Sequence, residues 1–461
     1  MMATYFFVFL FIAMLGYLGY YVAVSEEEML NNSYNTRQEI LKSLNYRGTI
    51  YSRDGDVLAR TQVDDEGNET RVYPYDNLFA HIVGYSTKGK TGVEALANYY
   101  LINTNTSLAN KAANDAAGLK NPGDNVYTTL DVELQKAASD ELGLYRGAIV
   151  VTEVGTGRIL AMVSRPDFDP NEIDEIWDQL VEDTDSAALV NRSTQGLYPP
   201  GSTFKIITAL EYIRQNQENY NEYSYKCNGS FVLGSSKISC YHGTKHGTVD
   251  FANSFAKSCN SSFANLGMEL DWDRFADTLD GLLFNRELPL GLAYSKSIAS
   301  ISASTPPAEK MQTSIGQGNT RMTPMHLNMI TSAVAGGGVL MKPYVVERVV
   351  NDAGRVIKSF EPDSCGSLMT EQEASALTEM MEEVVRTGTA KKLNGLDYTV
   401  AGKTGSAEYN SNKGDSHAWF TGFAPAQDPQ ICVTIIVEGA GSGGDYAVPI
   451  AKRLFNTYFA E

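Results

Sequence analysis

The longest apolar run of the chain lies at its beginning. Residues 3–24 contain no charged side chain and are rich in Phe, Leu, Ile and Tyr, and three glutamates follow at residues 26–28. A helix of about 20 such residues is long enough to span the hydrocarbon core of a bilayer. A cleaved signal peptide would have a shorter apolar region that ends in small residues, whereas residues 20–22 are Tyr-Tyr-Val. The pattern favours a retained transmembrane anchor over residues 1–24.

Beyond the anchor, shorter apolar runs are separated by turn residues and predict strands. Residues 49–51 and 57–59 flank Asp54-Gly55, which is a strong signal for a β-hairpin. A second predicted hairpin joins residues 147–152 to residues 158–163 through a glycine-containing turn.

The C-terminal part of the chain repeats this strand pattern. Further strands are expected at residues 398–404, 417–424 and 431–438, and a closing helix at residues 446–459. Strands at both ends of a unit with helices between them imply one antiparallel sheet flanked by helices. The predicted fold class is therefore α+β.

The length of the chain limits the number of domains, and its net charge limits the kinds of binding partner. A chain of 461 residues is too long for one ordinary domain and suggests two or three units. Its formal net charge is −18. Nucleic-acid binding requires a basic face that contacts phosphates, so this acidic balance argues against a nucleic-acid partner.

Candidate chemistry begins at residues 199–205, Pro-Pro-Gly-Ser-Thr-Phe-Lys. The prolines and glycine predict a turn that starts a helix, and residues three apart on a helix lie on one side. Ser202 and Lys205 would therefore be neighbours, and a desolvated Lys205 amine could take the proton from Ser202. The same Ser-x-x-Lys spacing recurs at Ser254 and Lys257 without the proline-glycine turn, so the spacing alone is weak evidence.

Two later motifs strengthen the interpretation of Ser202 as a nucleophile. Ser258-Cys259-Asn260 comes first and Lys403-Thr404-Gly405-Ser406 follows, in the order that penicillin-interacting serine transferases use. The second motif continues a β-prone run, whereas another Lys-Thr-Gly at residues 90–92 lies in a glycine-rich, charged loop. Order and local context therefore select the later set.

With these motifs the chain resembles the class B penicillin-binding proteins, which are monofunctional D,D-transpeptidases of bacterial cell-wall synthesis. The resemblance covers almost everything after about residue 45. Other segments that carry it are residues 47–55, 81–85, 92–94, 128–131 and 316–318.

The resemblance implies a domain organisation. Residues 25–122 would form a membrane-proximal pedestal, here called the pedestal, and residues 123–461 the penicillin-binding transpeptidase domain. Because no Lys or Arg precedes the apolar run of residues 3–24 and Glu26, Glu27 and Glu28 follow it, the positive-inside rule leaves the orientation open. It is the resemblance that places the catalytic domain outside the cytoplasm of a bacterial cell, on a single-pass anchor. About 100 residues cannot hold a glycosyltransferase domain, so the resemblance implies a separate glycan polymerase of the SEDS family as partner.

The resemblance also assigns the chemistry to the first two motifs. Ser202 would attack the penultimate D-Ala carbonyl of a peptidoglycan stem peptide, and Lys205 would accept its proton. Ser258 would relay that proton to the leaving amine, and Asn260 would hold Lys205 and the substrate amide.

The third motif would recognise the D-Ala-D-Ala end of the substrate. Lys403, with the hydroxyls of Thr404 and Ser406, would bind the terminal carboxylate, and Gly405 would let the substrate approach. Backbone N–H groups of Ser202 and Ser406 would form the oxyanion hole. β-Lactam antibiotics mimic this substrate end and would acylate the same serine. No cofactor is expected.

The five cysteines leave three alternatives open. Cys227 and Cys240 flank a hairpin-like excursion, so a disulfide is one alternative in an extracytoplasmic domain, and free thiols are another. A zinc site formed by Cys240, His242, His246 and Cys259 is the third. The spacings of these residues match no known metal motif, so no metal site is predicted.

Other functions share the three motifs. A D,D-carboxypeptidase differs only in passing the acyl group to water, and a serine β-lactamase must release it quickly. A non-catalytic scaffold for a polymerase is also compatible with the pedestal. A role in division, elongation or sporulation does not follow from the sequence.

Overall fold

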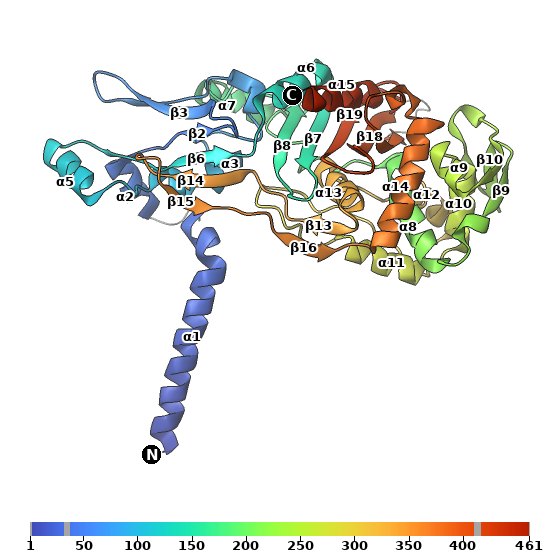
Figure 1. The fold of residues 1–461 in the computed structure, drawn as a ribbon, viewed down its shortest axis with the longest axis horizontal. Coiled ribbons are helices and arrows are strands. Elements are labelled where there is room, and N and C mark those ends of the chain that lie inside the picture. The colour runs from blue at the N-terminus through green and yellow to red at the C-terminus, as the bar shows by residue number, and fades with distance from the viewer. Residues whose placement is uncertain (1, 32–36, 410–415, 461) are drawn as a thin grey trace.

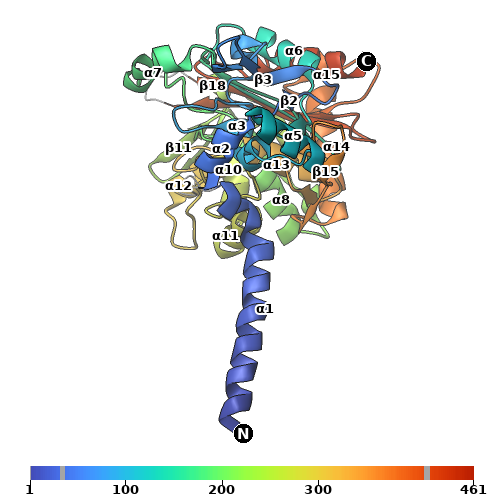
Figure 2. The same ribbon diagram turned by 90° about the vertical axis from the view of Figure 1, so that its left-hand side faces the viewer.

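The computed structural model describes residues 2–31, 37–409 and 416–460. Its first helix, α1 (Met2–Asn31), projects from the rest of the molecule as a separate rod (Figures 1 and 2). Residues 4–21 form one candidate membrane span, with a mean hydropathy of 1.6 and no burial against the protein. A helix satisfies its own backbone hydrogen bonds, as a segment inside a bilayer must. The predicted anchor is therefore helical, and its helix continues beyond Val24.

The pedestal is built around a six-stranded sheet with the strand order β15-β14-β6-β2-β3-β4, here called the pedestal sheet. The hairpin predicted around Asp54-Gly55 is confirmed, because β2 and β3 pair in antiparallel fashion. The strands are β2 (Ile50–Tyr51), β3 (Val57–Val63), β4 (Glu69–Val72), β6 (Asn125–Thr128), β14 (Val346–Val350) and β15 (Val356–Ser359).

Three strands of the pedestal sheet come from beyond residue 122. Strand β14 pairs with β6 on one side and with β15 on the other, which joins residues 346–359 to the pedestal. The division between residues 122 and 123 stays a prediction, and the two predicted units share this sheet. Short elements surround it: α2 (Arg37–Leu44), β1 (Asn45–Tyr46), η1 (Asp76–Phe79), α3 (Gly92–Leu96), α4 (Asn98–Ile102), α5 (Leu108–Ala117) and β5 (Asn121–Pro122).

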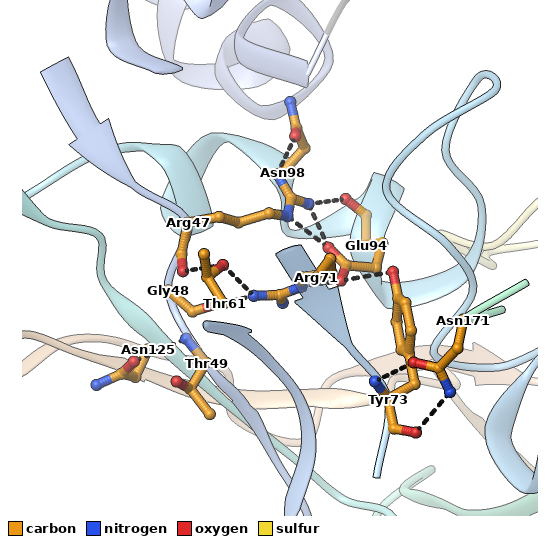
Figure 3. Close-up of polar contacts among 10 residues, drawn as sticks. All are labelled: Arg47, Gly48, Thr49, Thr61, Arg71, Tyr73, Glu94, Asn98, Asn125 and Asn171. Atoms are coloured by element: carbon orange, nitrogen blue, oxygen red, sulfur yellow. Dashed lines mark hydrogen bonds and ion pairs between the residues drawn. The ribbon is translucent and has the colours of Figure 1, made fainter. Parts of the chain in front are cut away.

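A buried ionic cluster holds the interior of the pedestal together (Figure 3). The Glu94 side chain is fully buried and accepts hydrogen bonds from Arg47 Nε at 2.6 Å and Arg71 Nε at 2.7 Å. Arg47 also donates to Asn98 Oδ1, and Tyr73 Oη donates to Glu94 at 3.2 Å. These residues come from four separate segments, so the cluster ties the strands to the short helices.

The second sheet has five strands in the order β17-β18-β19-β7-β8, and every neighbouring pair is antiparallel. The predicted hairpin of residues 147–163 and the predicted C-terminal strands are all present. Strand β17 covers residues 401–408 and not the predicted 398–404, because its pairing with β18 runs from Ala401 opposite Phe423 to Glu408 opposite Ser416. The strands are β7 (Gly147–Glu153), β8 (Ile159–Arg165), β17 (Ala401–Glu408), β18 (Ser416–Ala424) and β19 (Ile431–Val437).

Helices cover both faces of this sheet, since every residue of β18 and β19 is buried. Helices α6 (Val132–Leu142) and α15 (Ala447–Phe459) pack against each other on one face (Figure 1). Helix α13 (Pro324–Ala335) packs on β7, β18 and β19, and α14 (Glu371–Arg386) packs on β17. The α+β class with an antiparallel sheet flanked by helices is confirmed.

A mostly helical subdomain lies at the end of the molecule opposite the pedestal (Figure 1). It carries two antiparallel strand pairs, β9 with β12 and β10 with β11. Its elements are η2 (Gly201–Phe204), α8 (Lys205–Gln215), η3 (Tyr220–Glu222), β9 (Ser224–Cys227), β10 (Ser230–Leu233), β11 (Ser236–Ser239), η4 (Tyr241–Gly243), β12 (Gly247–Asp250), α9 (Phe251–Ala256), α10 (Asn260–Glu269), α11 (Trp272–Gly281) and α12 (Pro307–Thr313). The remaining elements are α7 (Ile173–Glu182), β13 (Val339–Met341), β16 (Ser364–Ser367) and η5 (Lys391–Leu393).

Candidate active site

The serine of the first motif lies on a 3₁₀ turn and not on the α-helix itself. The turn η2 contains Ser202, and α8 begins at Lys205. A 3₁₀ turn has three residues per turn, so residues i and i+3 are aligned and the two side chains of the motif lie on one side. The apolar residues that follow Lys205 are buried, as their helical spacing predicts, and they anchor α8 in the core.

Strand β17 runs against this turn at close range. A methyl group on Gly201 would lie 2.9 Å from the carbonyl oxygen of Ser406, and one on Gly405 would lie 3.1 Å from the carbonyl oxygen of Pro200. The Gly201 N–H also donates to the carbonyl of Gly316 at 2.9 Å. Glycine at residues 201 and 405 permits this approach, which brings the backbone of the first motif beside Ser406.

The amine of Lys205 lies at the centre of the site. Lys205 Nζ donates to Asn260 Oδ1 at 2.7 Å, to the Ser258 carbonyl oxygen at 2.9 Å and to Ser258 Oγ at 3.2 Å. The first and second motifs, which are more than 50 residues apart in the chain, are therefore in direct contact. This contact is the one that the resemblance implies for Asn260.

The third motif approaches the same hydroxyl from the other side. Lys403 Nζ donates to Ser258 Oγ at 3.0 Å and to the Thr404 carbonyl oxygen at 2.9 Å. Ser258 Oγ thus contacts the amines of two lysines, Lys205 and Lys403. A hydroxyl in this position can receive a proton from one amine and pass a proton on.

Burial changes the charge state of both lysines. The side chains of Lys205 and Lys403 are fully buried. Removal from water lowers the pKa of Lys205 to about 7, and Cys259 and Cys240 oppose this shift only in part. Burial also lowers the pKa of Lys403 well below its usual value, and the neighbouring Lys205 charge lowers it further. Lys205 can therefore be a neutral base at physiological pH.

The turn that carries the second motif has a strained backbone. Ser258 has a positive φ of 54°, which side chains other than glycine adopt at a cost, and α10 starts directly after it at Asn260. Asn260 Nδ2 donates to the Ser239 carbonyl oxygen at 3.1 Å. This bond fixes the side-chain amide of Asn260 to the end of β11, so that its oxygen points at Lys205 Nζ.

Two contributors to the site were not recognised in the sequence. The hydroxyl of Thr389 shares a hydrogen bond with the hydroxyl of Thr404. A methyl group on Gly443 would lie 2.5 Å from the Gly405 carbonyl oxygen, and the Gly443 N–H donates to Ser406 Oγ at 3.4 Å. The run of glycines at residues 439–444 was a visible signal for a close approach. Thr389 carries no local signal, because only the tertiary fold brings it to β17.

The competing motifs do not assemble. Ser254 is buried and its hydroxyl bonds to Ser262, whereas Lys257 is exposed. Lys90-Thr91-Gly92 lies where a pedestal loop ends and α3 begins. The later set of motifs is the one whose lysines meet at Ser258.

Comparisons with known proteins match both parts of the chain. The family model of the penicillin binding protein transpeptidase domain matches residues 147–456. The model of the penicillin binding protein A dimerisation domain matches residues 47–126. The peptidoglycan D,D-transpeptidase PbpA of Mycolicibacterium smegmatis is 30% identical over 436 residues, covering 88% of this chain and 87% of that protein.

Solved structures share the fold. A ceftriaxone acyl-enzyme complex of penicillin-binding protein A from Mycobacterium tuberculosis has a TM-score of 0.82 at 28% identity, covering 90% of this chain and 99% of that chain. A D,D-transpeptidase domain from Eggerthella lenta has a TM-score of 0.81 at 29% identity, with coverages of 90% and 99%. By family model, sequence and fold, the chain belongs to the penicillin-binding protein transpeptidase family.

Proposed function

We propose that this chain is a peptidoglycan D,D-transpeptidase that works through an acyl-enzyme on Ser202. The observation that carries the proposal is the pair of buried lysines on either side of Ser258 Oγ, at 3.2 Å from Lys205 and 3.0 Å from Lys403. A neutral Lys205 amine one 3₁₀ turn from Ser202 is what an activated serine nucleophile needs. Membership of the family, whose named relatives are D,D-transpeptidases, supports the same reaction.

The proposed acylation step moves one proton and breaks one amide bond. Ser202 Oγ attacks the carbonyl carbon of the penultimate D-Ala while Lys205 Nζ accepts the hydroxyl proton. The negative oxygen that forms is stabilised by the backbone N–H groups of Ser202 and Ser406, each donor contributing about 3 kcal/mol. The amide bond to the terminal D-Ala then breaks. The proton passes from Lys205 through Ser258 Oγ to the departing amine.

The second step resolves the ester. The amine of another stem peptide attacks the acyl carbon, forms the cross-linking amide and returns Ser202 to its hydroxyl form. Before acylation, Lys403, Thr404 and Ser406 bind the terminal carboxylate of the donor peptide, which leaves with the released D-Ala. The edge position of β17 leaves its outer side for the substrate chain. β-Lactams acylate Ser202 in the same way but their acyl group remains attached. The acyl-enzyme complexes solved for the Mycobacterium tuberculosis relative support this part of the proposal.

We also propose the placement of the enzyme in the cell. Helix α1 would anchor the chain in the bacterial membrane, with residues 25–122 as the pedestal and residues 123–461 as the extracytoplasmic transpeptidase domain. The two matched models, on residues 47–126 and 147–456, support this division and contain no glycosyltransferase. A glycan polymerase of the SEDS family is accordingly the proposed partner, and the pedestal is the part closest to the membrane.

The proposal is tested by labelling the full chain with a fluorescent penicillin. Mass mapping of the adduct is expected to find it on Ser202, and Ser202→Ala is expected to abolish labelling. A reaction with lipid II polymers as substrate, with and without an acceptor amine, then distinguishes transpeptidase from carboxypeptidase activity. Attachment to another residue would refute the assignment of the nucleophile. Rapid release of penicillin would indicate a β-lactamase. If Ser202→Ala restores growth to a strain that lacks the unmutated protein, the protein would be a scaffold.

A further inference from the structure

Four potential metal ligands meet in the helical subdomain beside the active site. Cys227 ends β9, Cys240 follows β11, His246 precedes β12 and Cys259 precedes α10. The ligand atoms of these four side chains all lie within 4.8 Å of one another. The three cysteines are almost completely buried, at 1%, 3% and 0% exposure. Four separate segments of chain thus converge on one point, here called the cysteine cluster.

The spacing of the ligand atoms fits a tetrahedral zinc ion. Zinc binds cysteine sulfur at about 2.3 Å and histidine nitrogen at about 2.0 Å, so tetrahedral angles separate two sulfurs by about 3.8 Å and a sulfur from a nitrogen by about 3.5 Å. The observed separations are 3.7 Å for Cys227 Sγ to Cys240 Sγ, 3.8 Å for Cys240 Sγ to Cys259 Sγ and 3.4 Å for Cys227 Sγ to His246 Nδ1. These three separations match those expected around a bound ion to about 0.1 Å, and the other three are at most 4.8 Å.

A disulfide fits the same geometry less well. Its sulfur atoms must be about 2.05 Å apart, and all three cysteines are free in the structure. Any one disulfide among them would also leave the third thiol unpaired in a buried site. The cysteine cluster is arranged around a common centre and not as a pair.

We propose that Cys227, Cys240, His246 and Cys259 form a closed, structural Zn²⁺ site. Three thiols would lose their protons to solvent as the ion binds, and neutral His246 would bind through Nδ1. Two donors already point at one of the sulfurs, since Ser261 Oγ donates to Cys227 Sγ at 3.1 Å and the Gly229 N–H donates to it at 3.4 Å. Such donors stabilise a metal-bound thiolate and orient it.

This set differs from the set that sequence spacing offered. His242 is exposed and its ring lies against Tyr241, with 4.0 Å between ring centroids. Cys227 takes the fourth position, because the pairing of β9 with β12 places Cys227 opposite Gly247, next to His246. The prediction that no metal site exists rested on linear spacings, and the ligands come together only through this strand pairing.

The site would hold the second motif of the active site in place. Cys259 lies between Ser258 and Asn260, both of which contact Lys205 Nζ. A zinc ion on Cys259 would tie this turn, with its positive φ at Ser258, to the two strand pairs of residues 224–250. A site of this kind positions residues that act on the substrate and does not itself take part in the reaction.

The test measures zinc in the full chain, purified in detergent once with and once without a reductant. One zinc per chain is expected by metal analysis, and loss of zinc is expected in Cys259→Ser and His246→Ala. The matched controls are His242→Ala and Cys365→Ser, which change an exposed histidine and an exposed cysteine outside the cluster and should retain zinc. Replacement of the ion by Co²⁺ in the unmutated protein should give the absorption of tetrahedral cobalt with sulfur-to-cobalt charge transfer. This spectrum does not depend on whether a variant folds.

Two results would overturn the proposal. One is a protein without zinc or cobalt affinity in which mass mapping finds a Cys227–Cys240 disulfide. The other is the same lack of affinity with all three thiols free to react with an alkylating probe. Zinc loss from His242→Ala but not from His246→Ala would overturn the assignment of the histidine.

A second measurement concerns the active site and rests on the proposed function. Removal of zinc by a chelator is expected to slow acylation of Ser202 by penicillin by about 10²-fold, the effect of a displacement near 1 Å in a positioned group. Restoration of zinc should restore the rate. If the zinc-loaded protein is not acylated at Ser202, the proposed function fails while the metal site stands. If stoichiometric zinc is absent, the metal site fails whatever the acylation rate.

Discussion

The molecule buries two clusters of cationic side chains, and it compensates their charges in opposite ways. In the pedestal, Arg47 and Arg71 share the fully buried carboxylate of Glu94 (Figure 3). In the active site, Lys205 and Lys403 are equally buried, and within residues 2–31, 37–409 and 416–460 neither forms a salt bridge with a carboxylate. Their partners are hydroxyl, carbonyl and amide oxygens.

The direction of each pKa shift follows from this difference. Burial alone would raise the pKa of Glu94, but Arg47 and Arg71 outweigh it and the pKa is lowered. Glu94 therefore remains ionised. Without a carboxylate, burial lowers the pKa of both active-site lysines. A paired cluster stabilises structure, whereas an unpaired one maintains an amine that can exchange its proton at neutral pH.

The largest expected effect comes from making the Lys205 charge permanent. Lys205→Arg should slow acylation by penicillin about 10²- to 10⁴-fold, because a guanidinium cannot act as a general base. The measurement is the rate of fluorescent-penicillin labelling at about pH 8, where a neutral lysine would predominate. Lys257→Arg, in the competing Ser-x-x-Lys sequence, is the matched control and should label normally. A rate near that of the unmutated protein in Lys205→Arg would disprove the role of the neutral amine.

The next effect is on stability and belongs to the pedestal. Glu94→Gln leaves two buried arginines without their carboxylate and should lower the free energy of unfolding by about 3–5 kcal/mol. Thermal or denaturant unfolding measures the loss. Asp445→Asn removes the carboxylate from an exposed pair with Lys392 and should cost less than about 1 kcal/mol. Equal losses in the two variants would contradict the importance of burial.

The same cluster predicts how stability depends on pH. Because the pKa of Glu94 is lowered in the folded protein, its stabilisation is complete above the carboxyl's ordinary value of 4.5 and is lost as the pH falls through the lowered value. Unfolding at several pH values below neutrality should show this loss in the unmutated protein and a weaker dependence in Glu94→Gln. Identical pH dependence in both would show that another group is responsible.

The smallest expected effect comes from giving Lys205 a carboxylate partner, as Arg47 and Arg71 have in the pedestal. Acylation by the unmutated protein should rise with pH through about 7 as Lys205 loses its proton. Asn260→Asp places a carboxylate 2.7 Å from Lys205 Nζ and should raise the lysine pKa by about 1–3 units. The rising limb of the pH–rate profile would move to higher pH by that amount. Asn260→Ala is the control without charge, and an upward shift there too would remove the electrostatic explanation.

Local patterns predicted much of the fold. The hairpin at Asp54-Gly55, the sheet hairpin of residues 147–163 and the C-terminal strands were all correctly expected, because alternation and turn residues act over a few positions. Strands β14 and β15 were not assigned to the pedestal sheet. Strand β14 pairs with β6, more than 200 residues earlier, and β15 pairs with β14; no local pattern encodes the partner of β14.

The candidate active site was likewise predicted only in part from the sequence. The motifs at Ser202, Ser258 and Lys403 were identified from residue type, order and context, and the structure brings Lys205 and Lys403 together at Ser258 Oγ. Thr389 was missed, and the proposed metal site contains Cys227, which the sequence offered only as a disulfide partner, in place of His242. Each reaches its position through strand pairing or helix packing between distant segments, which linear spacing does not report.

The sequence by itself determined which groups are available and how close some must be: a serine and a lysine three residues apart, a Ser-x-Asn turn and a Lys-Thr-Gly strand. Only the tertiary structure decided their protonation. The pKa of Lys205 depends on how much water and how much opposite charge surround its amine, and those surroundings come from residues 258, 260 and 403. Desolvation is a property of neighbours in space, so the reactivity of Ser202 is set by the fold although its motif is written in the chain.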